Sequence, residues 1–217
     1  MPEPKKMLTY SKTDGKLRRA PDLALDPWNW NWQADPDPVP ADAREVSLSD
    51  AVALLHGARQ CRFIPVGVIG PRTADSSCLE TAESLGLALG KLGVPVLCGG
   101  KAGVMEAVAR GVRQAGGLSI GFLPEEDWRA ANSAISLPLA TGIGRARNVL
   151  IAHASCALVA VGGQYGTISE VAFGLHFEKP VFGLCGAPDI VGVQQKESVS
   201  DVVDALMPIL LRLDGES

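Results

Sequence analysis

The amino-acid sequence predicts an α/β protein with a doubly wound parallel sheet, arranged as a Rossmann-like sandwich of three layers, α/β/α. From residue 63 onward, short and continuously apolar runs alternate with helical patterns. Such runs are typical of parallel strands that helices bury on both faces. The chain has 217 residues, of which 47% are hydrophobic and only 5% aromatic. It is therefore long enough to build one large aliphatic core.

The expected elements follow one another along the chain. Residues 47–59 (SLSDAVALLHGAR) predict a capped helix that leads into the main domain. Each expected strand is a short apolar run bounded by turn residues, at 63–70, 94–98, 118–123, 156–161 and 180–185. Each expected helix has apolar residues at helical spacing, at 76–92, 103–115, 144–154, 167–177 and 198–213. Residues 133–139 are expected to form an irregular extended piece.

The composition changes sharply near residue 45, so we predict an extended Pro- and Trp-rich segment over 1–45 and the main domain over 46–217. The prolines of DPWNWNWQADPDPVP exclude a long helix and favour extended or polyproline II geometry. Trp28, Trp30 and Trp32 alternate with other residues, so an extended backbone would place the three indoles on one side. This segment either anchors on its own domain or a partner subunit, or presents an aromatic surface to a ligand; buried tryptophan area favours anchoring.

Charge and hydropathy argue against two classes of partner. The net charge is −4 and the isoelectric point is near 5.4, whereas proteins that hold nucleic acid through many phosphates present a basic face. No apolar run reaches the roughly 18 residues that are needed to cross a bilayer. The N-terminus, MPEPKKMLTYSK, has no apolar signal region. We therefore expect a cytoplasmic protein without a membrane or nucleic-acid partner.

The cysteines and histidines predict no metal site and no disulfide. The five cysteines are scattered and never spaced CxxC, so they are expected to be free thiols in a reducing compartment: Cys61, Cys78, Cys98, Cys156 and Cys185. The three histidines show no metal-ligand spacing with each other or with cysteine. We expect neither a structural metal nor a cofactor.

Three turns between a strand and a helix are candidate ligand sites, because ligands of doubly wound sheets bind outside the carboxyl ends of the strands. They are GPRTADSS (70–77), CGGKAGVME (98–106) and GGQYGTISE (162–170). None contains GxGxxG or a P-loop, which argues against NAD-dependent chemistry and P-loop phosphotransfer. Glycines in such turns let backbone N–H groups approach an anion, and a helix N-terminus favours negative charge. The turns therefore predict an anionic ligand.

Two arginines lie at the start of the helix expected over 144–154. Arg145 and Arg147 fall in its first turn or two, where cations oppose the helix dipole by roughly a few tenths of a kcal/mol each. A nearby anion would turn this cost into a binding interaction. Residues two apart lie about 200° apart around a helix, so we expect only one of the two arginines to point into a given pocket.

The stretch RNVLIAHASCALVAVGGQYGTISE resembles the signature of the LONELY GUY (LOG) family, once mislabelled as lysine decarboxylases. That signature couples an arginine before one strand to a PGGxGTxxE loop after it, and CGGKAGVMEA resembles the family's GGGxxG[LV]M turn. The resemblance covers residues 63–212. It implies a Rossmann domain that hydrolyses the N-glycosidic bond of cytokinin nucleoside 5′-monophosphates and releases ribose 5-phosphate.

The resemblance and the turns together give the candidate site residues. Arg147 matches the motif arginine and Glu170 the motif glutamate, so these two are the candidate catalytic residues. The candidate ligand- and phosphate-binding residues come from the three turns: Gly70, Gly99, Gly100, Lys101, Gly103, Met105, Gly163, Gln164, Tyr165, Gly166 and Thr167.

Two departures from the LOG pattern point to a different branch. Gly162 stands in place of the motif proline, and Gln164 replaces the second glycine of the motif. The variant GGGYGTLSE, with ARN at the preceding helix start, is closer to this sequence. It is similar to proteins called molybdenum-cofactor carriers, which bind rather than hydrolyse.

Glu170 itself has two interpretations. Thr167 and Glu170 have the spacing of a capping box, in which their side chains satisfy the first backbone amides of the helix. Alternatively, Glu170 faces the ribose of a ligand whose phosphate lies over the loop from Gly163 to Thr167. A carboxylate in that place stabilises an oxocarbenium-like transition state and positions water. Arg147 would then orient Glu170 or hold the ribose or the phosphate.

The sequence thus leaves three functions from different classes. The first is binding of a nucleoside monophosphate or a related phosphorylated ligand, with phosphoribohydrolase activity through Arg147 and Glu170. The alternative is a non-catalytic nucleotide or molybdenum-cofactor carrier or sensor. The third, binding of single-stranded DNA, conflicts with the acidic isoelectric point. The resemblance also implies a homo-oligomer, a dimer or larger.

Overall fold

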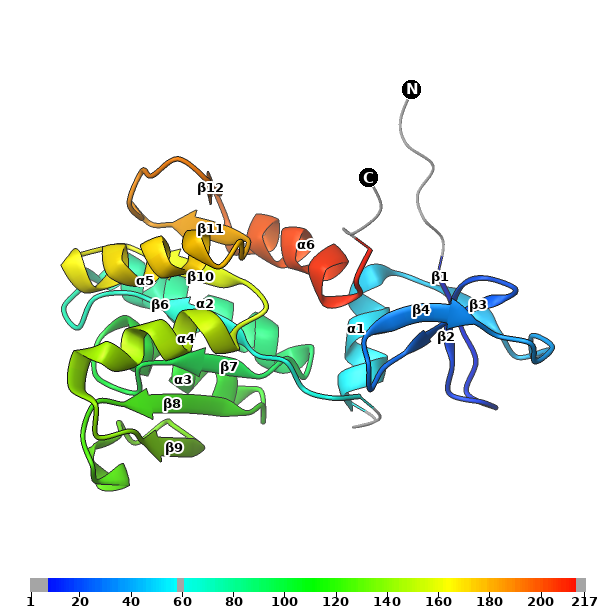
Figure 1. The fold of residues 1–217 in the computed structure, drawn as a ribbon, viewed down its shortest axis with the longest axis horizontal. Coiled ribbons are helices and arrows are strands. Elements are labelled where there is room, and N and C mark those ends of the chain that lie inside the picture. Colours follow the sequence, from blue (N-terminus) through cyan, green and yellow to red (C-terminus); the bar gives the residue numbers. More distant parts are fainter. Residues whose placement is uncertain (1–7, 58–60, 214–217) are drawn as a thin grey trace. The chain divides into compact units, whose positions relative to one another are not determined.

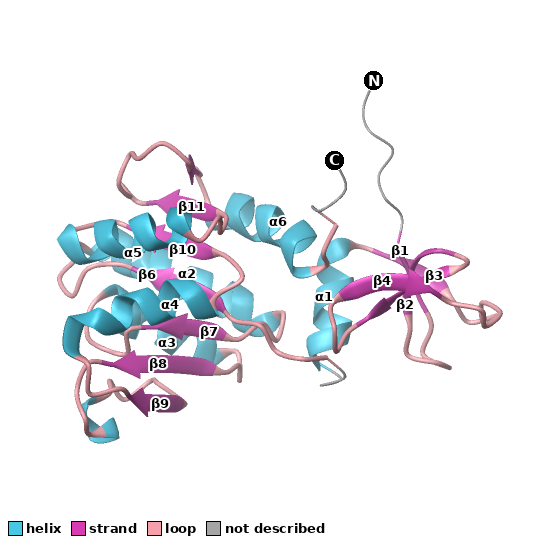
Figure 2. Ribbon diagram, viewed as in Figure 1, coloured by secondary structure: helices cyan, strands magenta, loops and turns pink. Residues whose placement is uncertain are grey.

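The computed structural model describes residues 8–57 and 61–213 and contains two separate sheets (Figure 1, Figure 2). Contacts divide these residues into two compact units. The larger unit comprises residues 63–206, and the smaller unit comprises the residues up to 62 together with those from 207. The predicted boundary between 1–45 and 46–217 stays a prediction, because a division by contacts does not show which part folds alone.

The larger unit holds a sheet of seven parallel strands in the order β12-β11-β10-β6-β7-β8-β9. The chain moves outward from β6 in one direction and then returns to β10, so the order reverses between these neighbours. This confirms the doubly wound sheet. The strands are β6 (Val66–Ile69), β7 (Val96–Cys98), β8 (Ser119–Leu123), β9 (Leu137–Ala140), β10 (Leu158–Val161), β11 (Val181–Leu184) and β12 (Val193–Gln195).

Helices cover both faces of this sheet and complete the three layers. Figure 1 shows α2 (Ser76–Lys91) and α3 (Val104–Gln114) on one face, and α4 (Asn148–Ala154) and α5 (Tyr165–His176) on the other. Two short 3₁₀ helices are η1 (Trp128–Ala130) and η2 (Gly144–Arg147), and α6 (Val199–Leu210) closes the chain. No helix of the described ranges is long and apolar enough to cross a membrane.

The core of this unit lies between the sheet and its helices. Every residue of β6, β10 and β11 is buried, which explains why these strands are apolar without alternation. The sequence did not predict β12. The piece expected to be irregular over 133–139 contributes most of β9, which pairs in parallel with β8 at the edge of the sheet.

The smaller unit contains an antiparallel sheet in the order β4-β3-β2-β1-β5, and α1 (Leu48–Gly57) follows β5 in the sequence. The sequence predicted one extended segment here, but the chain turns back repeatedly. Its strands have only three or four residues each, which is too short for a recognisable alternation. They are β1 (Leu8–Tyr10), β2 (Leu17–Ala20), β3 (Leu23–Asp26), β4 (Asn31–Ala34) and β5 (Arg44–Val46).

The three tryptophans do not share one side, so that expectation was wrong. Trp30 adopts a φ of 53°, in the left-handed region, at the turn between β3 and β4. This conformation breaks the alternation of an extended chain. The Trp30 and Trp32 indoles donate to the carbonyl oxygens of Arg62 and Leu211 at 2.7 and 3.0 Å, whereas Trp28 is 55% exposed. Two of the indoles therefore anchor the segment within its own unit.

One pair of cysteines forms a disulfide, which corrects the expectation of five free thiols. Cys78 lies in the first turn of α2 and Cys185 follows β11, with a Cα–Cα distance of 5.7 Å. The two are 107 residues apart in sequence, and only the strand order brings them together. The other three cysteines take part in no disulfide.

Glycines at the contact between α2 and α3 yield a test of the packing. A Cβ atom on Gly111 of α3 would overlap the carbonyl oxygen of Glu83 on α2. We predict that Gly111→Ala lowers the free energy of unfolding by about 2 kcal/mol, because overpacking outweighs the gain in helix propensity. Gly57→Ala is the matched control, since a Cβ there meets nothing within 4 Å. Urea unfolding measures both; equal stability of the two variants would contradict the close packing.

Candidate functional site

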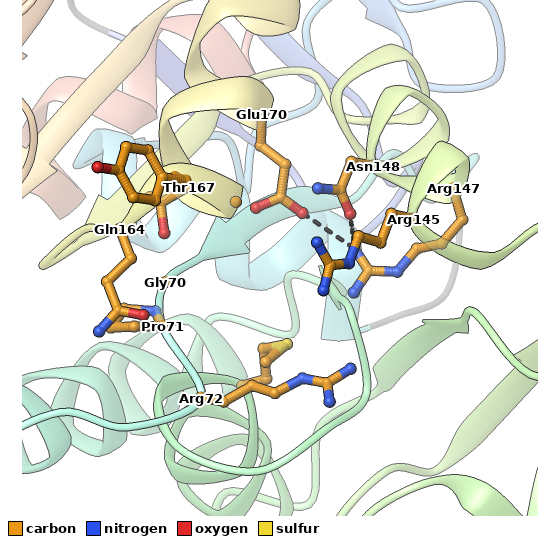
Figure 3. A pocket seen from close by; sticks show the side chains of 12 residues that line it. Gly70, Pro71, Arg72, Arg145, Arg147, Asn148, Gln164, Thr167 and Glu170 are labelled. Atoms are coloured by element: carbon orange, nitrogen blue, oxygen red, sulfur yellow. Dashed lines mark hydrogen bonds and ion pairs between the residues drawn. The ribbon is translucent and has the colours of Figure 1, made fainter.

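A cavity of about 340 Å³ opens in the larger unit at the carboxyl ends of β6 and β10 (Figure 3). These strands are neighbours, and the strand order reverses between them, so the cavity lies where doubly wound sheets bind ligands. Its volume is at the lower end of the range for small-molecule sites. It is lined by Gly70, Pro71, Arg72, Met105, Arg145, Arg147, Asn148, Gln164, Tyr165, Gly166, Thr167 and Glu170.

One wall of the cavity is the N-terminus of α5. Gln164 is the N-cap residue in an extended conformation, and no side chain caps this end. Of the two interpretations of Glu170, the capping box is therefore wrong: α5 begins at Tyr165, two residues before the predicted start, so Thr167 falls inside the first turn and Glu170 bonds to Arg147. The start of a 12-residue helix without a side-chain cap offers backbone N–H groups to an anion.

A buried ion pair forms the floor of the cavity. The Arg147 guanidinium donates to Glu170 Oε1 at 3.0 Å, and both side chains are only 8% exposed. Arg147 also donates to Asn148 Oδ1, and the Asn148 amide donates to Ser169 Oγ at 3.2 Å. These bonds tie the start of α4 to the first turns of α5. Gly99 leaves room for this guanidinium, because a Cβ atom there would displace the end of the Arg147 side chain.

Burial controls the ionisation of Glu170. Loss of hydration raises the pKa of its carboxyl group to about 7, and the charge and hydrogen bond of Arg147 oppose this rise only in part. A carboxyl group that titrates near neutral pH inside a cavity is typical of sites that bind or transform ligands. The neighbouring Cys98 is not such a group, because burial raises the pKa of its thiol to about 11.

Both Arg145 and Arg147 line the cavity, so the expectation that only one would do so is wrong. Residues 144–147 form a 3₁₀ helix and α4 begins only at residue 148. The two side chains also enter at different depths: Arg147 is buried at the floor, and Arg145 is exposed. In Figure 3 their guanidinium groups project toward the same region as that of Arg72.

Six of the predicted ligand-binding residues line the cavity: Gly70, Met105, Gln164, Tyr165, Gly166 and Thr167. Gly99, Gly100, Lys101, Gly103 and Gly163 do not. Lys101 is bonded to Glu125 Oε1 at 2.8 Å and to the Ala130 carbonyl oxygen at 2.7 Å. Gly103, at a φ of 75°, lets the start of α3 approach the turn after β6, where the Val104 amide donates to the Pro71 carbonyl oxygen at 3.1 Å. A ligand-binding role for these five residues stays a prediction.

Sequence reasoning missed three residues of the wall, Pro71, Arg72 and Asn148. Pro71 and Arg72 lie within the first of the three turns that the sequence singled out, and only Gly70 was chosen there. The signal that was available is the arginine itself, since a cation in a turn at the carboxyl end of a strand faces the same space as the glycine-rich loops.

Two buried polar atoms in the wall have no hydrogen-bond partner in the described part of the chain. They are Nε of Arg147 and Oγ1 of Thr167. Both residues line the cavity, and an unpaired buried polar atom costs free energy until it finds a partner. Both atoms can pair with a polar ligand or with water, and the arginines of the wall favour an anion.

Comparisons with known proteins cover the part of the chain that holds this cavity. A sequence profile described as the SLOG cluster4 family (LDcluster4) matches residues 63–208. An uncharacterized protein of Archaeoglobus fulgidus is 37% identical over 143 residues, which are 66% of this chain and 94% of that protein.

Two solved structures are similar to this chain over about two thirds of its length. The molybdenum cofactor binding protein of the phototrophic bacterium Rippkaea orientalis is 31% identical, with a TM-score of 0.65 over 69% of this chain and 98% of that one. The Moco carrier protein of Chlamydomonas reinhardtii is 35% identical, with a TM-score of 0.64 over 70% of this chain and 99% of that one.

The raised pKa of Glu170 predicts a pH dependence of stability. The folded state holds the proton up to about pH 7 and the unfolded state releases it near 4.5, so this carboxyl group lowers stability as pH rises between these values. We expect the unfolding free energy of Glu170→Gln minus that of wild type to rise by on the order of 2 kcal/mol from about pH 5 to about pH 8. It rises because only wild type loses stability over this interval. Urea unfolding at both pH values measures it.

The control for this experiment is Glu80→Gln, which changes an exposed glutamate on α2. This variant reports the effect of a Glu→Gln change outside the cavity over the same pH interval. A Glu170→Gln variant whose difference from wild type does not change with pH would show that Glu170 is ionised throughout, as half of a salt bridge with Arg147.

Proposed function

The chain belongs to the SLOG cluster4 family, and we propose that it binds the molybdenum cofactor as cargo and carries it without changing it. The observation that carries the proposal is the arginine-lined cavity at the uncapped start of α5. Relatives at 31% and 35% identity to this chain are named for binding or carrying that cofactor. The cargo is a pterin that bears a phosphate and a dithiolene-bound metal.

The phosphate of the cargo fits the start of α5. Gln164 leaves the first backbone amides of α5 without a side-chain cap, and such amides bind phosphate together with the helix dipole. Arg72 and Arg145 add two cations to the same cavity. Their guanidinium groups suit the oxygen atoms of a phosphate or an oxo-metal centre, because they donate two parallel hydrogen bonds.

The pterin ring fits the apolar and aromatic part of the wall. Tyr165 is 91% exposed at the edge of the cavity and its ring is available for stacking. Met105 provides an adaptable apolar surface on the side of α3. Gly166 keeps the space open, because a Cβ atom there would meet nothing within 4 Å.

A second function is favoured by one observation, the buried pair of Arg147 and Glu170 inside the cavity. A carboxyl group with a pKa of about 7 can stabilise an oxocarbenium-like state and position water at neutral pH. The chain would then act as a nucleoside 5′-monophosphate phosphoribohydrolase, in which Glu170 assists cleavage of the glycosidic bond and Arg147 orients it. The carrier function has the stronger support, because it also agrees with the named relatives.

Binding of the cargo should depend on the open side of the cavity. We predict that Gly166→Leu abolishes binding of the molybdenum cofactor without loss of stability, since the leucine fills the cavity and favours the helix. Arg145→Ala should weaken binding by about tenfold through loss of a charged hydrogen bond. Arg129→Ala is the control, because Arg129 is exposed and paired with Asp127 away from the cavity. Retention of cofactor released from a denatured molybdoenzyme, followed by pterin fluorescence, gives the affinities.

The two proposed functions separate in a parallel assay. Incubation with nucleoside 5′-monophosphates should leave each nucleotide intact, as followed by chromatography of free base and ribose 5-phosphate. Turnover that disappears in Glu170→Gln would replace the carrier function by phosphoribohydrolase activity. Equal retention of the cofactor by Gly166→Leu and wild type would remove the cavity as the binding site.

The proposed carrier also forms a homo-oligomer in the cytoplasm. Its support is the pair α4 and α5, which expose three large apolar side chains, Leu150, Ile168 and Phe173. Such exposed groups gain free energy when a second copy covers them. We expect light scattering to give at least twice the chain mass of 22.7 kDa, and Phe173→Asp to shift the mass toward the monomer. Val191→Asp, at a side chain that is 99% exposed elsewhere, should leave the mass unchanged; a monomeric wild type would refute the oligomer.

A further inference from the structure

The disulfide between Cys78 and Cys185 lies directly beside the wall of the cavity. Cys78 is held at the start of α2, where its backbone amide donates to Asp75 Oδ1 at 2.7 Å. Cys185 is the first residue after β11. In the sheet β10 separates β11 from β6, the strand that precedes α2. The bond therefore bridges the carboxyl end of β10, from which the loop at the start of α5 emerges.

Gly162 shows how close this bridge is to the cavity loops. A Cβ atom built on Gly162 would lie 3.6 Å from Cys78 Sγ, 3.6 Å from the Cys185 carbonyl oxygen and 3.8 Å from Cδ of Pro71. The Gly162 amide donates to the Leu184 carbonyl oxygen at 2.9 Å. Gly162, which begins the loop that leads to Gln164, thus lies beside both the disulfide and the turn at Pro71, and Pro71 and Gln164 line the cavity.

The turn after β11 has an uncommon backbone conformation at the disulfide. Cys185 has a φ of 54° and the next residue, Gly186, a φ of 70°. The left-handed region is uncommon for a residue other than glycine, and it persists only where the surroundings enforce it. The disulfide is one such restraint. Its loss gives this turn, and the loops that pack on it, access to other conformations.

The site is also open to a reductant. Cys78 is buried, but Cys185 is partly exposed and Gly186 beside it is exposed. Attack by a thiolate on Cys185, the more exposed residue of the pair, makes Cys78 the leaving thiolate at the N-terminus of α2, where the helix dipole favours negative charge.

The geometry points to a reversible thiol–disulfide site at Cys78 and Cys185 that controls retention of ligand in the adjacent cavity, with dithiols as its reactants. One thiolate of the dithiol bonds to Cys185 as the Cys78–Cys185 bond breaks, and Cys78 takes up a proton. The second thiolate of the dithiol then displaces Cys185, which is protonated in turn. The protein gains two thiols and the dithiol becomes a disulfide. The control of ligand retention rests on the proposed function of the cavity.

The oxidised form is the one that holds ligand. Its bridge fixes the loops after β6, β10 and β11 relative to one another, and preorganised loops bind with a smaller loss of conformational entropy. In the reduced form the same loops must be ordered when ligand enters. Reduction should therefore weaken binding by about fivefold or more, which is the lower end of measured coupling between linked sites.

The test uses the full chain in its oxidised and dithiothreitol-reduced forms, with EDTA in every sample, because Asp75 and the two thiols could bind a metal after reduction. Thiol titration of the unfolded protein should find three thiols before reduction and all five cysteines after it. Amide hydrogen exchange should then become faster in residues 70–72 and 162–166 on reduction. The affinity for the molybdenum cofactor should fall in parallel.

Two variants separate the effect from a general action of the reductant. Cys185→Ser should show the reduced behaviour under both conditions, whereas Cys61→Ala, which changes a buried cysteine of the smaller unit, should respond as wild type does. If Cys185→Ser does not fold, the comparison of oxidised and reduced wild type still decides the question.

Each outcome has a defined meaning. Faster exchange and weaker binding on reduction support the redox control. Unchanged exchange and affinity, or five titratable thiols in protein treated with a mild oxidant, would overturn it. If hydrogen exchange becomes faster on reduction but no cofactor binds in either form, the proposed carrier function is refuted. The effect of the disulfide on the loops would then still stand.

Discussion

The reversal of strand order between β6 and β10 is the constraint on which the site depends. The two strands are hydrogen-bonded neighbours, yet the helices that follow them, α2 and α5, cover opposite faces of the sheet. The loops that leave the two strands must therefore diverge, and their divergence leaves a cavity that no side chain of the sheet fills. Backbone amides at the start of α5 and the turn at Pro71 face this space because the topology puts them there.

The buried pair of Arg147 and Glu170 gives this cavity its charge and also its cost. Two ionisable groups have been removed from water, and such burial is repaid only when hydrogen bonds satisfy both partners. Here the cost of burial is only partly offset, since Nε of Arg147 has no partner among the described residues and the pKa of the Glu170 carboxyl group is raised. Apolar side chains in the same place would stabilise the folded state more. The pair is therefore better explained by an anionic ligand, which gains from Arg147 most when Glu170 carries its proton.

The sequence predicted those parts of the molecule that local patterns determine. The apolar runs located β6, β10 and β11, and one of the glycine-rich turns, the one after β10, lines the cavity. Strand burial and tight turns leave a direct trace in residue type. Arg147 and Glu170 followed from a motif. Features that depend on distant segments did not follow: the bond between Cys78 and Cys185 requires knowledge that β10 lies between β6 and β11. The left-handed turn at Trp30 and the short strands before residue 47 also lack a periodic signal.

Thermodynamic linkage joins the disulfide to the cavity in both directions. If reduction of Cys78 and Cys185 weakens the hold on a ligand by some factor, the bound ligand must make the disulfide harder to reduce by the same factor. A loaded protein would then resist reductants that open the empty one, and it would release cargo only to a reductant strong enough to overcome that difference. Protonation of Glu170 acts on the same cavity but from its floor. A carrier needs such couplings more than a hydrolase does, because it has no chemical step that weakens its own complex and must release an unchanged ligand.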